Sequence, residues 1–430
     1  MTNLNHNCPA DISTRVSGTT VTVHFTEPTA ARWNYVLLLA SGASAWVPGG
    51  CGSSCMASSS EQPAGSSYSL AISHGVNGWG QWSDFSPYTV GGGAIVGVVE
   101  GFYWSNAHAV HGVSGQYTHA QRRRLLRVLQ DRGLQAFVYA PQTADTISPW
   151  PAVDSREWRA TADLARSLGV RLVYGLRPGW VDGTTPSRVQ DKLDELIAAG
   201  VGEYVLAWDD TAGAGTLDQM QAQGDLIMTH LSNYRSSECA LLAIVPAAYH
   251  AKTDTHVPAG HNTTWESQLL LLDGGVDTRI PFVLAGPSVT PLAVSVPDSF
   301  PRLSSGRPFI LWDNWCAVDT STRIPWALPR NRDPALFRAP FGGVLLNLAF
   351  PPERVIHAIF ALALHGAVDA ATEEQAAAYW AGFLAHDRFI TDARRPAVQA
   401  ALLAAIRDDK FYSSIGELTA AVPALEGVFL

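Results

Sequence analysis

The sequence predicts an α/β protein whose central part is a closed (β/α)8 barrel of the TIM type, with a small all-β domain before it and helices after it. Three observations support this: eight short apolar runs, amphipathic segments between them, and a change in residue pattern on either side. We place the domains at residues 1–92, 93–364 and 365–430. A chain of 430 residues is too long for one compact core, which agrees with several domains.

Residues 1–92 are expected to form a β-sandwich. TVTVHF alternates at period two, and WNYVLLLA and YSLAIS have the composition of buried strands. The closing segment GWGQWSDFSPYTV resembles the last strands of a fibronectin type III module, and the GGG that follows marks a linker. We therefore predict a fibronectin III-like module in front of the barrel.

Eight apolar runs in the central domain are predicted to be parallel strands. They are almost continuously apolar because a barrel strand is buried on both faces. In order they are AIVGVVEGFYW, LQAFVYAP, VRLVYGLRPG, EYVLAWDD, LLAIVPAAY, IPFVLAGP, PFILWDN and GVLLNLAF. A doubly wound open sheet is the alternative, but the Gly-rich phosphate turn usual after its first strand is missing.

The segments between these runs carry helix signals. THAQRRRLLRVLQDRG has an N-cap candidate in Thr118 and a closing Gly133. SREWRATADLARSLG and SRVQDKLDELIAAG repeat the pattern. Residues 365–430 are also expected to be helical, in TEEQAAAYWAGFLAHD, RRPAVQAALLAAIRDD and SIGELTAAVPAL.

Composition narrows the partners that the protein can have. The net charge of −9 gives no electrostatic reason to bind nucleic acid or an anionic membrane. No apolar run reaches the roughly 18 residues of a membrane span, and the start MTNLNHNCPADIST lacks the order of a secretory signal. The compartment is cytoplasmic if the chain is complete and extracellular if a leader has been removed. Nothing in the sequence predicts the oligomeric state.

The five cysteines suggest no metal site. They are scattered at Cys8, Cys51, Cys55, Cys239 and Cys316, and other ligands at metal-binding spacing are missing around them. Cys51 and Cys55 lie in one Gly/Ser-rich loop, so they could pair with each other, or one of them with Cys8, or all could be free thiols. We expect neither a metal nor a cofactor.

Polar residues gather at the carboxyl ends of the predicted strands, where barrel enzymes carry their reactive groups. The adjacent pair Asp209 and Asp210 ends the fourth run. Neighbours within a strand face opposite ways, but both can turn towards the mouth where a strand becomes a loop. Two close carboxyls tend to titrate apart, one staying an acid while the other is an anion, which is what cleavage of an acetal requires. One Asp capping a helix is the structural alternative.

The strand ends resemble those of the family 84 glycoside hydrolases, which include β-N-acetylglucosaminidases acting on O-GlcNAc proteins. GVVEGFYW, YAPQTAD, LAWDD, IVPAAYH, GPSV, ILWDNWCAVD and LLN occur in that family's order over essentially the whole barrel. The Asp-Asp pair and the WDN-x-x-x-x-D segment are the specific parts. The resemblance implies a retaining exo-β-N-acetylhexosaminidase, in which the 2-acetamido oxygen of the substrate attacks C1 and forms an oxazoline.

The resemblance also implies roles for individual residues. Asp209 would accept the acetamide N–H and stabilise the developing charge, and Asp210 would be the general acid and then the general base. Tyr249 would hydrogen-bond the acetamide oxygen. Trp312 would either wall the acetamide pocket or pack in the barrel. The remaining expected contacts to the sugar are Asn314 beside the acetamide group, Asp319 at the 4- and 6-hydroxyls, and Asn347 and the backbone of Gly101 at other hydroxyls.

Two departures from the family pattern leave the sugar and the aglycone open. Gln142 stands in YAPQ where the family usually has the lysine of YAPK, so a neutral amide replaces a cationic sugar contact. After GFY the chain continues with Trp104 and Ser105 instead of the usual glycine. GlcNAc is the simplest substrate, GalNAc or a hyaluronan-like chain is the enzymatic alternative, and a non-catalytic carbohydrate-binding protein is the alternative of another class.

Overall fold

The computed structural model divides the chain into two compact units that separate between Gly93 and Ala94. In the first unit the backbone of six strands is described. In the second the structure describes residues 94–101, 116–142, 146–211, 215–231, 239–251, 265–278, 280–296, 298–301, 303, 305–316, 324–325, 328–337, 341–348, 352–364, 370–408, 411–412 and 423–425. Each unit is described by itself.

The N-terminal unit contains two antiparallel sheets of three strands each. The first has the order β1 (Ala10–Ser17), β2 (Thr20–Thr26), β5 (Cys55–Ser59), and the second has the order β4 (Ser44–Val47), β3 (Asn34–Leu39), β6 (Tyr68–Ser73). The likeness to fibronectin type III stays a prediction. The disulfide alternatives involve Cys8, Cys51 and the side chain of Cys55, which lie outside what is described.

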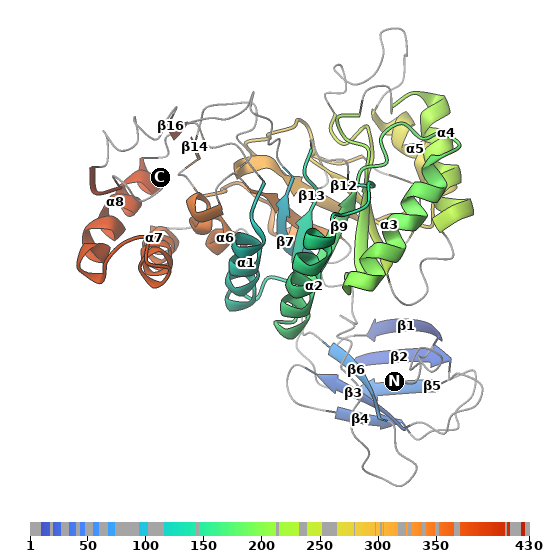
Figure 1. Ribbon diagram of the computed structural model, residues 1–430, viewed down its shortest axis with the longest axis horizontal. Helices are drawn as coiled ribbons and strands as arrows, with labels where there is room; N and C mark the ends of the chain where they lie inside the picture. Colours follow the sequence, from blue (N-terminus) through green and yellow to red (C-terminus); the bar gives the residue numbers. More distant parts are fainter. Residues whose placement is uncertain are drawn as a thin grey trace. The chain divides into compact units, whose positions relative to one another are not determined.

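The second unit is the predicted barrel of eight parallel strands, and each apolar run supplies one strand (Figure 1). The closed order is β10-β11-β12-β13-β15-β7-β8-β9. The strands are β7 (Ile95–Glu100), β8 (Ala136–Tyr139), β9 (Arg171–Leu176), β10 (Glu203–Ala207), β11 (Ala240–Val245), β12 (Phe282–Leu284), β13 (Phe309–Asp313) and β15 (Gly343–Asn347). The open doubly wound sheet is thereby excluded.

Closure of the barrel between β15 and β7 depends on a glycine. Gly343 pairs with Ile95 at φ +131°, and a Cβ there would collide with the backbone of Ile95. Only a residue without a side chain fits both the conformation and the space.

Helix α1 (His119–Asp131) begins and ends at residues with the expected capping signals. It starts in a capping box, because Thr118 accepts from the backbone of Gln121 and the Gln121 side chain accepts from Thr118, and Gly133 follows it at φ +67°. Both predicted signals are thus confirmed. The other described helices are α2 (Ala152–Ser167), α3 (Thr185–Ala199), α4 (Leu217–Asp225), the π-helix η3 (Leu226–Leu231), α5 (Trp265–Gly275), α6 (Ile356–Leu362), α7 (Ala370–His386) and α8 (Arg395–Arg407).

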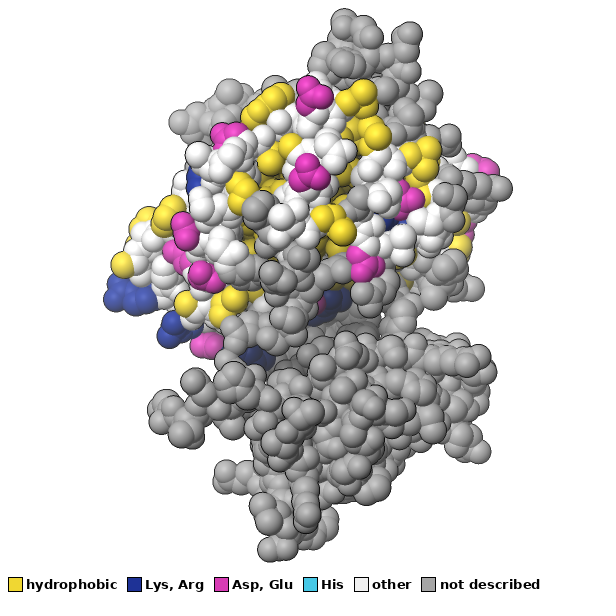
Figure 2. All heavy atoms as spheres, turned by 90° about the vertical axis from the view of Figure 1, so that its right-hand side faces the viewer, with side chains coloured by type: hydrophobic (Ala, Val, Ile, Leu, Met, Phe, Trp, Pro, Cys, Tyr) yellow, Lys and Arg dark blue, Asp and Glu magenta, His cyan; other side chains and the backbone are white. Residues whose placement is uncertain are grey.

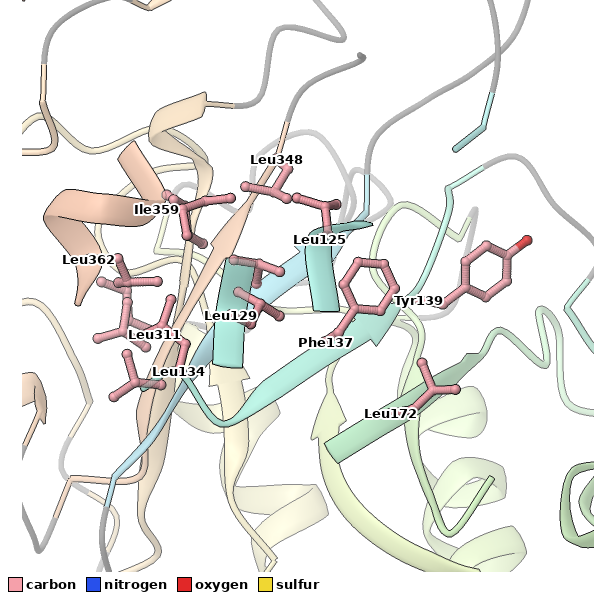
Figure 3. Close-up of a cluster of buried hydrophobic side chains, with 14 of the residues drawn as sticks. Leu125, Leu129, Leu134, Phe137, Tyr139, Leu172, Leu311, Leu348, Ile359 and Leu362 are labelled. Carbon is pink, nitrogen blue, oxygen red and sulfur yellow. The ribbon is translucent and has the colours of Figure 1, made fainter. Parts of the chain in front are cut away.

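The barrel has two hydrophobic cores. The outer core fills the layer between strands and helices, and the inner core fills the inside of the barrel. In the outer core, Leu125 and Leu129 of α1 pack with Phe137 of β8 and with Ile359 and Leu362 of α6 (Figure 3). Each fully buried leucine stabilises the fold by about 2 kcal/mol.

The inner core is built from smaller residues, chiefly Val and Ala. Consecutive residues alternate between the two cores: Ala207 belongs to the inner core and Trp208 to the outer. Within each strand, this period of two decides which side chains face the inside of the barrel.

One face of the barrel unit exposes several large apolar side chains. They are Leu217 of α4, Met228 of η3, and Leu270 and Leu271 of α5. Figure 2 shows hydrophobic, polar and acidic side chains interspersed on this face. No helix in the described part of the chain is long and apolar enough to cross a bilayer.

Candidate active site

Five of the predicted site residues lie at or just beyond the carboxyl ends of the barrel strands, close to the inner core. Each stands two positions beyond a residue of the inner core. These are Gly101 after Val99, Gln142 after Ala140, Asp209 after Ala207, Asn314 after Trp312, and Asn347 after Leu345. Tyr249 and Trp312 belong to the inner core itself.

Asp209 is almost fully buried, with 2% of its surface exposed, and both of its carboxylate oxygens accept hydrogen bonds. Nη1 of Arg177 donates to Oδ1 at 2.8 Å, and Nε2 of Gln142 donates to Oδ2 at 2.5 Å. Nη2 of Arg177 also donates to the backbone carbonyl of Asp209. Two N–H donors, one facing each oxygen, fix the orientation of this side chain.

Asp210 turns towards the mouth because its backbone is left-handed, at φ +55°. This conformation costs an ordinary residue about 1–2 kcal/mol, and Asp is among the few that adopt it. The hydroxyl of Tyr249 donates to Oδ1 of Asp210 at 3.3 Å. Both neighbours therefore contact side chains from other strand ends, Asp209 that of Gln142 and Asp210 that of Tyr249.

Two other buried carboxylates at the ends of strands, Glu100 and Asp313, each form an ion pair with an arginine. Glu100 accepts two hydrogen bonds from Arg122, at 2.8 and 2.9 Å. Burial raises the pKa of the Glu100 carboxyl, and the Arg122 guanidinium opposes that rise. Asp313 accepts two hydrogen bonds from Arg332, at 2.7 and 2.9 Å. Each pair satisfies a carboxylate in a closed two-bond arrangement, so we assign neither acid to catalysis.

Opposite the acid pair, three polar side chains and one backbone group form a continuous network. The indole N–H of Trp312 donates to Oδ1 of Asn314 at 2.9 Å, and Nδ2 of Asn347 donates to the same oxygen at 2.8 Å. Oδ1 of Asn347 accepts from the backbone N–H of Gly101 at 3.1 Å. Each amide thus fixes its neighbour before any substrate enters.

Trp312 has a packing role whether or not it also meets substrate. Its ring lies so close to Gly101 that any side chain at that position would collide with it, and 3% of the residue is exposed. This explains why position 101 is a glycine.

Two parts of the predicted site lie outside the described residues. They are Asp319 and the loop that begins Phe102-Tyr103-Trp104. Among the residues that the structure describes, no group of three or more His, Cys, Asp or Glu side chains is arranged to hold a metal ion.

Arg177 is the site residue to which the sequence assigned no role. Its RPG segment is visible as a polar strand end, but nothing in the sequence identifies its partner, which lies 32 residues further along. Parallel pairing of β9 with β10 brings the two together, with Leu176 opposite Leu206.

Comparison with known proteins gives a consistent picture. A model of the beta-N-acetylglucosaminidase family matches residues 96–388, and no curated protein matches. Among solved structures, a mutant O-GlcNAc hydrolase from Thermobaculum terrenum is similar in fold, with a TM-score of 0.56 and 16% identity. The match covers 72% of this chain and 66% of that chain, which is just under two thirds of its length.

Proposed function

The chain belongs to the beta-N-acetylglucosaminidase family, and on that basis we propose that it is a retaining exo-β-N-acetylhexosaminidase of the O-GlcNAcase type. The substrate would be a glycan or glycoprotein that ends in an N-acetylated sugar, most simply GlcNAc. The observation that carries the proposal is the pair of adjacent carboxyls at the mouth, Asp209 bound by two N–H donors and Asp210 by a tyrosine hydroxyl.

In the first step the acetamido oxygen of the substrate attacks C1. Asp209 accepts the acetamide N–H and stabilises the positive charge that develops on that group, while Asp210 gives its proton to the leaving oxygen. The C1–O bond breaks and an oxazoline forms. No nucleophile from the protein is needed, which suits two carboxyls too close together to stand on opposite sides of the bond.

In the second step water opens the oxazoline at C1. Asp210, now a carboxylate, removes the proton of the water and returns to its acid form. C1 is inverted twice, so the configuration is retained. The mechanism uses no metal and no cofactor.

The remaining residues are proposed to hold the sugar. Oε1 of Gln142 is buried and accepts no hydrogen bond within the described part of the chain, so it can accept one from a sugar hydroxyl while Nε2 holds Asp209. Tyr249, Asn314 and Asn347 present further polar groups at the mouth. Asp319 completes the set on the grounds of sequence alone.

Two alternatives differ from this proposal in the ligand or in the chemistry. The same mechanism could act on GalNAc or a hyaluronan-like chain, and the neutral Gln142 is the feature that keeps this open. A carbohydrate-binding protein without activity is disfavoured because both carboxylates are present and both contact side chains from other strand ends.

Hydrolysis of matched 4-nitrophenyl glycosides tests the proposal. The β-N-acetylglucosaminide should be cleaved at least about 10³-fold faster than the β-glucoside, which lacks the acetamide that supplies the intramolecular nucleophile. The N-acetylgalactosaminide, assayed beside them, decides between the epimers. Equal rates for glucoside and N-acetylglucosaminide would contradict the proposal, and binding of N-acyl sugars without turnover would support the carbohydrate-binding alternative.

A further inference from the structure

We propose that Arg177 is a positioning residue for the reaction: it fixes the carboxylate of Asp209 at the angle at which that carboxylate receives the substrate amide. This inference rests on the proposed function, because it assumes that Asp209 acts on the acetamide group. Arg177 follows β9 directly and lies beside the end of β10, where Asp209 stands.

The guanidinium holds Asp209 at two points. Nη1 binds the side-chain oxygen Oδ1 at 2.8 Å, and Nη2 binds the backbone carbonyl of the same residue. A donor that contacts both the side chain and the main chain of one residue fixes the rotation of that side chain about its own backbone. A lysine ammonium, with one nitrogen, cannot reproduce this two-point contact at the same place.

Arg177 is itself held in place. Its backbone N–H donates to Oγ1 of Thr146 at 2.6 Å, and Thr146 is 1% exposed. The side chains of Arg177 and Asp209 are 8% and 3% exposed, so the ion pair is shielded from the solvent that weakens surface pairs.

The arrangement leaves room for substrate. A carboxylate has about four acceptor sites, of which Arg177 and Gln142 use one on each oxygen. An acetamide N–H can therefore still bind Asp209. A carboxylate already bound by two N–H donors is poorly suited to deliver a proton, which leaves proton transfer to Asp210.

The matched control lies on the same strand. Arg171, at the other end of β9, also binds a carboxylate at the adjacent strand, donating to Glu203 at 2.7 and 2.5 Å. Arg171→Met removes an arginine–carboxylate pair between the same two strands away from the mouth. It should keep kcat/KM within about threefold of the wild type.

Arg177→Met should lower kcat/KM for aryl N-acetylglucosaminides by about 10²-fold, mostly through kcat, with KM changed by less than about threefold. The loss should be the same for activated and poor leaving groups, because Asp209 acts on the acetamide whatever group departs. Arg177→Lys should recover about tenfold of it, since charge is kept and geometry is not. If Arg177→Met does not fold, Arg177→Lys alone should show a loss of about tenfold.

Activity of Arg177→Met within threefold of the wild type would overturn the inference, as would a loss confined to poor leaving groups. A wild-type protein without activity on any N-acyl glycoside would contradict the proposed function but not the structural part of this inference, which is that Arg177 orients the Asp209 carboxylate. Crystal structures of the wild type and Arg177→Met then decide it. The Asp209 carboxylate should rotate away from its wild-type position in the variant, and an unmoved carboxylate would overturn the role of Arg177.

Discussion

Asp210→Asn should lower kcat/KM by about 10²–10⁴-fold for N-acetylglucosaminides with poor leaving groups, such as alkyl glycosides, and by less than about tenfold for 4-nitrophenyl or 2,4-dinitrophenyl glycosides. An activated phenol departs as an anion without help, whereas an alkoxide needs the proton that Asp210 supplies. The measurement is a plot of log kcat/KM against the pKa of the leaving group, which should become steeper in the variant.

Asp209→Asn is the control for that plot, because its loss should not depend on the leaving group. In the Asp210→Asn variant, the hydroxyl of Tyr249 can still donate to the side-chain oxygen at position 210, so the shape of the site is preserved. Parallel plots for the wild type and Asp210→Asn, with equal losses throughout, would contradict the assignment of Asp210 as the general acid.

Asp209→Asn should reduce kcat/KM by about 10²–10³-fold for every leaving group. The substitution removes the negative charge that stabilises the acetamide as it becomes positive. It also replaces one acceptor oxygen by an NH2 group, so that the hydrogen bond from Arg177 to Oδ1 or the one from Gln142 Nε2 to Oδ2 is lost.

Steady-state kinetics on the matched glycosides, with the melting temperature measured beside them, separate lost catalysis from lost folding. A folded Asp209→Asn protein with more than a tenth of wild-type kcat/KM would show that Asp209 does not take part in the chemical step.

The barrel could be predicted from sequence because each strand is buried on both faces. Such a strand is a continuous apolar run, whereas an element with one face in solvent alternates apolar and polar residues. The ends of strands were harder to place. The apolar run EYVLAWDD predicts one strand, but β10 ends at Ala207, and Asp209 and Asp210 lie in the turn beyond it. Alternation within a strand cannot predict the left-handed backbone of Asp210, which directs its side chain into the mouth.

The contacts that complete the site could not be predicted, because they join residues distant in sequence through the register of the barrel. The bond between Gly101 and Asn347 spans 246 positions and exists only because β15 closes against β7. Arg177 and Asp209 meet for the same kind of reason at β9 and β10. The sequence pattern indicates that such residues are polar and follow predicted strands, whereas only the fold determines which of them pair.

Above all, we propose that the acetamide of the substrate, held by Asp209, is the nucleophile. Its most direct test is the rate of the wild-type protein on 4-nitrophenyl glycosides whose N-acetyl group carries zero, one, two or three fluorine atoms. Fluorine withdraws electron density from the carbonyl oxygen, so kcat/KM should fall steeply with each added atom, by about 10³-fold or more over the series. A rate that is indifferent to fluorination would contradict this role of the acetamide.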